Sequence, residues 1–170
     1  NSAQHRQMAE LMVDDMRKIG IDLRPSLNNK PRFLQKAQKG QLQLFRLSWV
    51  GDYPDAENFL QLFYGRNAGG CNRIFFKDPV FDRMYEEAMV MDDSPARTEK
   101  YMAMARYLSE SCPWIFESHP ISFTLVHSWV GNYQPHDFAF AGWKYLSVDG
   151  AARKAATRKF KPMSMEDLRK

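Results

Sequence analysis

The sequence has 170 residues, of which 44% are hydrophobic and 14% aromatic, so it can bury a core, and the disordered and fibrous classes are excluded. The formal net charge is +4, but residues 151–170 contain seven basic and two acidic residues, which leaves 17 basic and 18 acidic residues in 1–150. We therefore expect one nearly neutral folded region at 1–150 and a basic extension at 151–170. The longest apolar runs are shorter than the roughly 20 residues of a membrane-spanning helix.

The first fifty residues predict two helices and two strands. Apolar residues recur at helical spacing from Ser2 to Ile19, and Gly20 stands where a helix C-terminal cap is expected. Residues 21–27 alternate in polarity and predict an edge strand, and Pro31–Lys39 predicts a short helix that begins at a proline. Leu42–Val50 is apolar on both faces, which favours a strand in a sheet covered by helices.

The rest of the chain continues the alternation of helices and strands. A turn-forming cluster at 51–55 precedes a short helical pattern through Phe63, and Asp-Pro and Ser-Pro pairs begin two longer helices at 79–90 and 95–111. Strands are predicted at 114–116, 121–126 and 143–148, and a short helix is predicted to begin near Ser164. The fold class is therefore α/β.

No catalytic or metal-binding pattern emerges from the sequence. Cys112 and His119 could be imagined as a nucleophile and base, but a helix end and a turn explain them, and no GxSxG, HExxH or phosphate-binding glycine motif occurs. Glu117, His119 and His127 could be imagined as metal ligands, but structural histidines are the commoner outcome. We expect no enzymatic activity, no metal and no cofactor.

Two features leave alternatives open. Cys71 and Cys112 either form a disulfide that closes a loop of about forty residues or remain small buried thiols. The basic tail suggests phosphate contacts with a nucleic acid or, as the preferred interpretation, a solvated extension; its candidate contacts are Arg153, Lys154, Arg158, Lys159 and Lys161.

The most informative segment is Ser48–Leu60. Trp49, Gly51 and Asp52 follow one another at the end of the predicted buried strand, where ligands of open α/β sheets bind. The alternative is that Asp52 and Asp55 cap the helix that follows.

This segment resembles the W-x-[GA]-D-Y-P-D-P-x-N-F-L block of family 5 of the bacterial extracellular solute-binding proteins. Further blocks follow in the same order: 72–82 is similar to N-x-x-x-Y-x-N-P-x-F-D, 110–115 to the helix before the A-P-x-I-P strand, and 129–135 to W-V-x-G-Y-x-P. The resemblance covers about 4–149, and 117–127 resembles the oligopeptide-binding, YejA-like branch. Ala56, Asp78 and Val80 depart from the usual proline, asparagine and acid.

The resemblance implies the C-terminal lobe of a type II periplasmic-binding-protein fold, a mixed sheet covered by helices. It implies the substrate-binding component of an ABC-type importer, which captures oligopeptides in the periplasm and delivers them to permease subunits in the inner membrane. The alternatives are another solute, such as a nickel chelate, haem, an opine or an oligosaccharide, and an interaction or nucleic-acid module that uses the tail.

In peptide-binding relatives, the aspartate of the block binds the ammonium group of the ligand, which implies this role for Asp52. Trp49 is implied to line the neighbouring side-chain pocket, or else is a core aromatic, and Tyr53 is the third expected ligand-binding residue. Family members have several hundred residues in two lobes, so the chain resembles their last part only. We expect such a part to self-associate through the aromatic surface around Trp49 and Tyr53.

Overall fold

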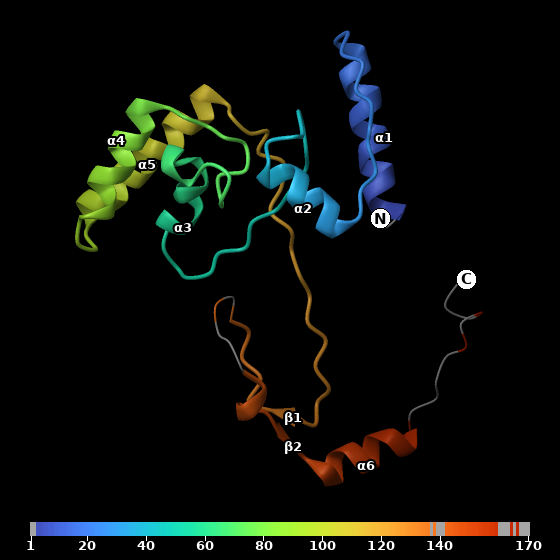
Figure 1. Ribbon diagram of the computed structural model, residues 1–170. Helices are drawn as coiled ribbons and strands as arrows, with labels where there is room; N and C mark the ends of the chain where they lie inside the picture. The colour runs from blue at the N-terminus through green and yellow to red at the C-terminus, as the bar shows by residue number, and fades with distance from the viewer. Residues whose placement is uncertain (1–2, 137, 139–141, 160–163, 165, 167–170) are drawn as a thin grey trace. The chain divides into compact units, whose positions relative to one another are not determined.

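The computed structural model describes residues 3–136, 138, 142–159, 164 and 166. The chain separates into two compact units, Asn1–Trp114 and Ile115–Lys170, which are described here one at a time (Figure 1). Unit 1 is helical, and its helices enclose the main core of the described chain. Unit 2 contains a small sheet and one helix.

The helices of unit 1 begin and end close to the predicted positions. Three of the helices, which begin at 30, 79 and 95, have both a proline and a capping side chain near their start, and these local signals fix the first turn. The elements are α1 (Ala3–Lys18), α2 (Lys30–Gln38), α3 (Glu57–Leu60), the 3₁₀ turns η1 (Gln61–Phe63) and η2 (Gly65–Asn67), α4 (Pro79–Met89) and α5 (Pro95–Ser111). The predicted helices of this unit are thereby confirmed.

Glycines end the first two helices. Gly20 has a φ of +82° and Gly40 a φ of +64°, a left-handed conformation that glycine adopts without the steric cost of a side chain. After α1, the N–H of Ile21 donates to the carbonyl of Met16 at 2.9 Å. After α2, the N–H of Gln41 donates to the carbonyl of Lys36 at 2.9 Å. Both ends therefore have the Schellman geometry.

The core of unit 1 is built around Phe63 and Phe81. The ring of Phe63 lies 6.1 Å from that of Phe81 and 4.4 Å from that of Trp114, centroid to centroid. Phe81 and Met104 are fully buried and come from α4 and α5. Asn72 is also fully buried, and its amide donates to the carbonyls of Tyr64 and Phe76. The segment 57–64 is thereby packed against both long helices.

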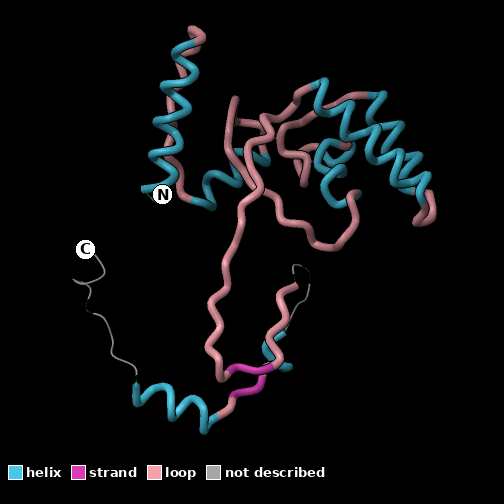
Figure 2. The backbone as a smooth tube through the Cα atoms, turned by 180° about the vertical axis from the view of Figure 1, so that it is seen from behind, coloured by secondary structure: helices cyan, strands magenta, loops and turns pink. Residues whose placement is uncertain are grey.

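The two strands predicted in unit 1 are not formed. Residues 21–27 and 42–50 are loop (Figure 2), and Leu44, Leu47 and Val50 are exposed. A strand needs a neighbour that accepts and donates its backbone hydrogen bonds, and no described segment lies in register beside these residues. The apolar pattern of 42–50 is therefore present without the pairing that it predicts.

Unit 2 differs from the prediction in a similar way. Its strands are β1 (Val130–Gly131) and β2 (Ser147–Val148), paired antiparallel with Val130 opposite Val148. Residues 114–116 and 121–126 are loop. Of the predicted strand 143–148, residues 143–145 lie in the 3₁₀ turn η3 (Gly142–Tyr145), and 147–148 form β2. Leu125 is 98% exposed. The strands predicted at 114–116 and 121–126 are not formed because these apolar residues have no described partner strand.

The basic tail begins with a helix that lies earlier in the chain than the one predicted from the sequence. α6 (Gly150–Lys159) follows Asp149, whose carboxylate accepts from the N–H groups of Ala151 and Ala152 at 2.9 Å. Alanine, lysine and arginine are good helix formers, and the aspartate satisfies the first amides. Ser164, where a short helix was predicted to begin, is not helical. Most of the residues after it lie outside the described residues, as does Lys161, a candidate phosphate contact.

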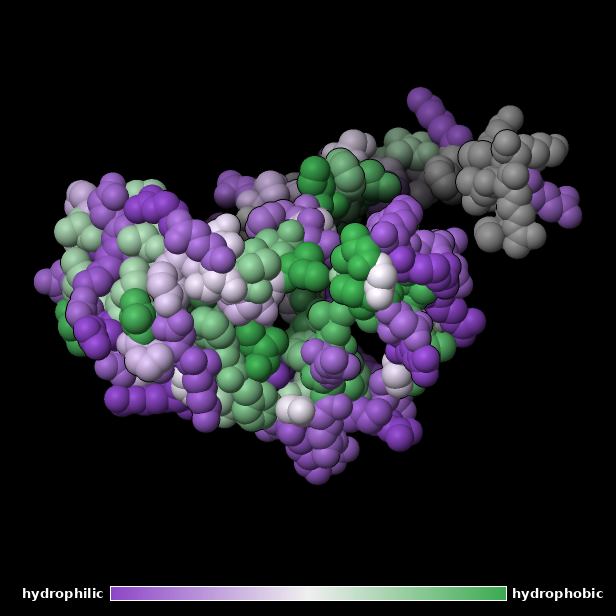
Figure 3. Space-filling view, turned by 90° about the horizontal axis from the view of Figure 1, so that it is seen from above, coloured by the Kyte–Doolittle hydropathy of each residue, from purple (hydrophilic) through white to green (hydrophobic). Residues whose placement is uncertain are grey.

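Apolar side chains remain at the surface in both units. The space-filling view shows apolar surface between polar side chains (Figure 3). On α1, Leu11 is 55% exposed although neighbouring members of its apolar stripe are half-buried. Among the described residues, no helix combines the length and apolar character needed to cross a membrane.

Replacing Asp78 with alanine is expected to destabilise unit 1 by about 1–3 kcal/mol. One oxygen of Asp78 accepts from the N–H groups of Val80 and Phe81, and the other accepts from the Tyr107 hydroxyl at 2.7 Å. The cap therefore joins α4 to α5. Urea unfolding measures the change, and Asp92→Ala, an exposed aspartate in the next turn, is the control. Equal stability of the two variants would contradict the role of the cap.

Deleting residues 151–170 is expected to leave the thermal midpoint of the chain within about 1–2 °C. The described side chains of α6 are exposed, except for the half-buried Ala156, so this helix contributes few packing contacts. Differential scanning calorimetry measures the midpoint. A drop of many degrees would show that the tail packs against the fold.

Candidate functional site

The candidate site is the turn between residue 49 and α3. Asp55 connects the turn to the start of α3. The Asp55 carboxylate accepts from the N–H of Glu57 at 2.8 Å, and the N–H of Asp55 donates to the carbonyl of Tyr53 at 2.9 Å. The sequence left open whether Asp52 and Asp55 cap the helix that follows or belong to a ligand site. Ala56 holds the N-cap position of α3, and Asp55, just before it, supplies the oxygen that caps the first amide, whereas the Asp52 carboxylate makes no hydrogen bond to the described helix backbone.

Asn58 connects the two predicted ligand residues. Its side-chain oxygen accepts from the indole Nε1 of Trp49 at 2.9 Å and from the backbone N–H of Asp52 at 3.1 Å. Its Nδ2 donates to Oδ2 of Asp52 at 3.4 Å. Asn58 is 1% exposed, so a buried amide brings Trp49 and Asp52 together.

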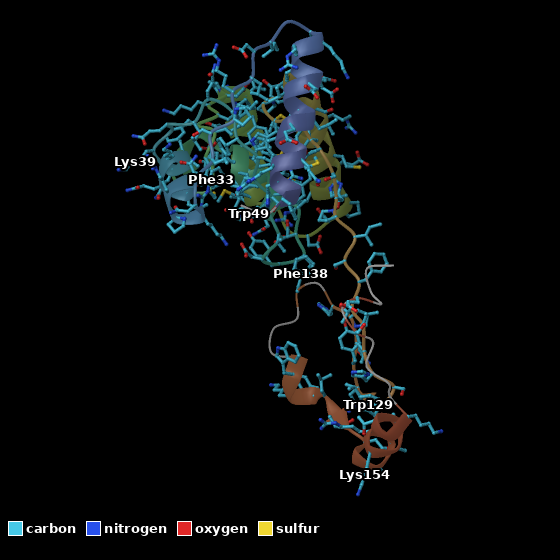
Figure 4. All side chains as sticks on the ribbon, turned by 90° about the vertical axis from the view of Figure 1, so that its right-hand side faces the viewer. Phe33, Lys39, Trp49, Trp129, Phe138 and Lys154 are labelled. Atoms are coloured by element: carbon cyan, nitrogen blue, oxygen red, sulfur yellow. The ribbon has the colours of Figure 1, made fainter. Side chains whose placement is uncertain are left out.

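Trp49 and Asp52 face different surroundings. Trp49 is half-buried and packs against the core of unit 1; Figure 4 labels its side chain. Asp52 is exposed, and no cation lies within ion-pair distance of its carboxylate among the described residues. The Asp52 carboxylate is therefore accessible to a positively charged group from outside.

Tyr53 is bound to Glu57 and is not free at the tip of the turn. Its hydroxyl donates to one oxygen of Glu57, and the hydroxyl of Tyr85 donates to the other. The bond to Glu57 and partial burial raise the pKa of Tyr53. Burial raises the pKa of Tyr85, and the Glu57 carboxylate raises it further. The Tyr53 ring remains 41% exposed, so its face is available although its hydroxyl is not.

A second carboxylate anchors the turn to α5. Arg97 donates to Asp55 at 2.6 Å, and the two side chains are 15% and 29% exposed, respectively. The Arg97 guanidinium lies 4.7 Å from the ring centre of Tyr101. Burial opposes ionisation of Asp55, but the N–H of Glu57 and the Arg97 charge outweigh it and lower the pKa of Asp55. Burial and the nearby Asp55 raise the pKa of Tyr101 to about 12.

A surface hollow of about 320 Å³ lies elsewhere in unit 1. Its lining combines apolar and basic side chains at the end of α2 and in the loop before α4: Lys39, Gly40, Leu42, Gln43, Phe45, Arg73, Ile74 and Phe75. Trp49, Asp52 and Tyr53 do not line it. The predicted ligand residues thus lie on an exposed turn and not in this hollow.

The other residues considered from sequence are not assembled into a site. Both thiols are free, with Cys71 half-buried and Cys112 exposed, so the disulfide is not formed. The His127 ring stacks on that of Trp129 with centroids 4.0 Å apart. Within the described part of the chain, no three histidine, cysteine or acidic side chains are placed to hold a metal ion.

Sequence analysis missed the residues that support the turn. Asn58 and Glu57 lie inside the informative segment, but their spacing did not show that they bind its aromatic and acidic members. Arg97 is 42 residues from Asp55 in sequence, and no local pattern connects the two.

The beginning of the chain matches a known protein family. Residues 1–70 match the family described as "Bacterial extracellular solute-binding proteins, family 5 Middle". Heme-binding protein A of Haemophilus influenzae is 29% identical over 85% of this chain and 27% of that protein. A dipeptide-binding protein of Pseudomonas aeruginosa is 30% identical over 81% of this chain and 24% of that protein.

The Escherichia coli protein MppA is similar in both sequence and structure. As the periplasmic murein peptide-binding protein, it is 25% identical over 86% of this chain and 28% of its own length. A solved structure of MppA, the murein tripeptide binding protein in an unliganded open form, superposes with a TM-score of 0.61 at 26% identity, covering 66% of this chain and 22% of that one. This chain spans about a quarter of the length of these relatives.

Asp55→Asn is expected to destabilise unit 1 by about 1–3 kcal/mol at neutral pH, because it removes the charge that Arg97 binds and leaves the capping oxygen in place. The folded-state pKa of Asp55 lies below its ordinary value of 3.8. The stabilisation is therefore present above that value and is lost as the pH falls through the folded-state pKa.

Urea unfolding at a series of pH values tests this expectation: the difference between wild type and Asp55→Asn should vanish in acid. Glu87→Gln is the control, because Glu87 is 53% exposed and pairs with Lys100 at the surface, where ion pairs contribute little. A stability difference that persists unchanged below pH 3.8 would contradict the ion pair as its cause.

Proposed function

We propose that this chain, which belongs to family 5 of the bacterial extracellular solute-binding proteins, is the C-terminal part of the substrate-binding component of an ABC-type importer. The complete protein captures short peptides in the periplasm and delivers them to permease subunits in the inner membrane. The names of the relatives support this: MppA is a periplasmic murein peptide-binding protein, and other relatives are named di/tripeptide-binding proteins. The relatives are named as binding proteins and not as enzymes.

One observation carries the assignment of the site: an exposed carboxylate stands beside a half-buried indole. Asp52 has no cation partner in the described chain, and Trp49 is held next to it by Asn58. A peptide presents an ammonium group next to its first side chain, so a carboxylate and an aromatic surface fixed together match that end of the ligand. Tyr53 adds an exposed ring beside them.

A closed cleft would make this contact strong. An ammonium group removed from water needs an opposite charge and hydrogen bonds to compensate for its lost hydration. Closure of two lobes around the peptide supplies the exclusion of water, and ligand contacts to both lobes favour the closed state. Membership of a particular branch within the family stays a prediction.

Haem is the second candidate ligand, because Heme-binding protein A is among the relatives with substantial coverage of this chain. Haem carries carboxylates and no ammonium group, so Asp52 is not suited to it. Binding of haem by the complete protein, unaffected by replacement of Asp52, would favour this alternative.

In the complete protein, Asp52→Asn is expected to weaken binding of a free dipeptide or tripeptide by about 2–5 kcal/mol, since one member of an enclosed charge pair is removed. An N-acetylated peptide lacks the ammonium group and should bind wild type weakly. Its affinity should change little when Asp52 is replaced. Isothermal titration calorimetry measures both affinities.

Glu99→Gln, which removes a charge from an exposed position on α5, is the matched control and should bind like wild type. Equal affinity of wild type and Asp52→Asn for the free peptide would refute the assignment of Asp52.

A further inference from the structure

The side chain of Asn58 is a polar group buried in an apolar setting. It is 1% exposed, and the nearby Leu60 and Leu62 belong to the hydrophobic core. Burying an amide costs free energy unless its hydrogen bonds are made inside the protein. The described structure supplies these bonds from two residues, and both are predicted ligand residues of the proposed site.

The bonds that Asn58 accepts are better formed than the one that it donates. The indole of Trp49 and the backbone N–H of Asp52 reach its oxygen at 2.9 and 3.1 Å, whereas its Nδ2 lies 3.4 Å from Oδ2 of Asp52. Since hydrogen bonds of this type are strongest near 2.9 Å, the amide oxygen is what fixes the turn. The weaker bond orients one carboxylate oxygen and leaves Oδ1 without a described partner.

Asn58 is itself held by the core. It lies in α3, where its backbone N–H donates to the carbonyl of Asp55 and its carbonyl accepts from Gln61. The residues that it binds are less constrained, because Asp52 is exposed and Trp49 precedes the turn in a loop. Asn58 therefore fixes the exposed loop that contains Trp49 and Asp52 relative to the packed helix α3.

We infer that Asn58 is a positioning residue that holds the Asp52 carboxylate and the Trp49 ring in one arrangement, so that the ammonium group and the first side chain of a peptide are recognised together. This inference rests on the proposed function, because it assumes that Asp52 and Trp49 contact the peptide. An apolar residue of similar size at position 58 would pack equally well but would leave two donors unpaired.

The test uses the complete protein with selective ¹⁵N labelling of tryptophan, and the Trp49 indole signal is assigned by its loss in Trp49→Phe. In wild type, the Trp49 indole proton should exchange slowly with solvent. Asn58→Ala removes the acceptor, so exchange of this proton should accelerate and affinity for a free tripeptide should fall about tenfold, as expected for the loss of one such bond. Should that variant be recovered unfolded, Asn58→Ser, whose hydroxyl is too short to reach both donors, carries the same expectation.

Asn58→Leu distinguishes positioning from a merely structural packing role. It fills a similar volume but has no acceptor for Trp49 and Asp52, so protection of the indole proton should be lost and affinity should fall about as far as in Asn58→Ala. The matched control is Asn72→Ala, which removes another fully buried asparagine whose bonds go to Tyr64 and Phe76. It should lower the unfolding temperature without changing the peptide affinity of the folded protein.

The outcomes separate this inference from the function on which it rests. If Asp52→Asn leaves peptide affinity unchanged, the proposed function of the site is wrong. If Asp52→Asn weakens binding but Asn58→Ala does not, or if Asn58→Leu binds the peptide like wild type, the site stands and the positioning role of Asn58 is refuted.

Discussion

The packing of Phe63 between α4 and the end of α5 is the constraint on which unit 1 depends. Its ring contacts Phe81 from α4 and Trp114 just after α5, so one side chain joins three segments. Buried aromatic pairs of this kind contribute about 0.5–1.5 kcal/mol beyond the area that they remove from water. Because η1, which ends at Phe63, continues directly from α3, the same packing fixes the helix from which Asn58 and Glu57 project.

The candidate turn is consequently fixed by bonds to the packed helices of unit 1. Glu57 accepts from Tyr53 within the turn and from Tyr85 on α4, and Asp55 binds Arg97 on α5. The bond from Tyr53 and the Asp55–Arg97 pair link the turn to packed helices, and the bond from Tyr85 joins α4 to α3. A carboxylate intended to meet a ligand charge has to remain unpaired in the free protein, and this arrangement satisfies its neighbours while leaving Asp52 accessible.

The accuracy of the sequence predictions follows the range of the interactions involved. Helix starts at Asp78 and Ser94 were predictable because a cap bonds to amides two or three residues away. The loop at 42–50 was not predictable, since an apolar run predicts a buried strand but says nothing about which segment pairs with it. In the site, the nearness of Trp49 and Asp52 follows from their spacing. The ion pair between Asp55 and Arg97 depends on how α5 packs, which no local pattern encodes.

The exposed apolar segments bear on how strongly the candidate site could bind. Val50, which directly precedes the turn, is 78% exposed, and the relatives are about four times as long as the region that they share with this chain. A charge pair at such an open surface contributes about 0–1 kcal/mol, because water screens both partners. The same pair inside a closed cleft contributes several times more. Affinity for a peptide would therefore depend on covering this surface, with Asp52 and Trp49 determining which end of the ligand is recognised once water is excluded.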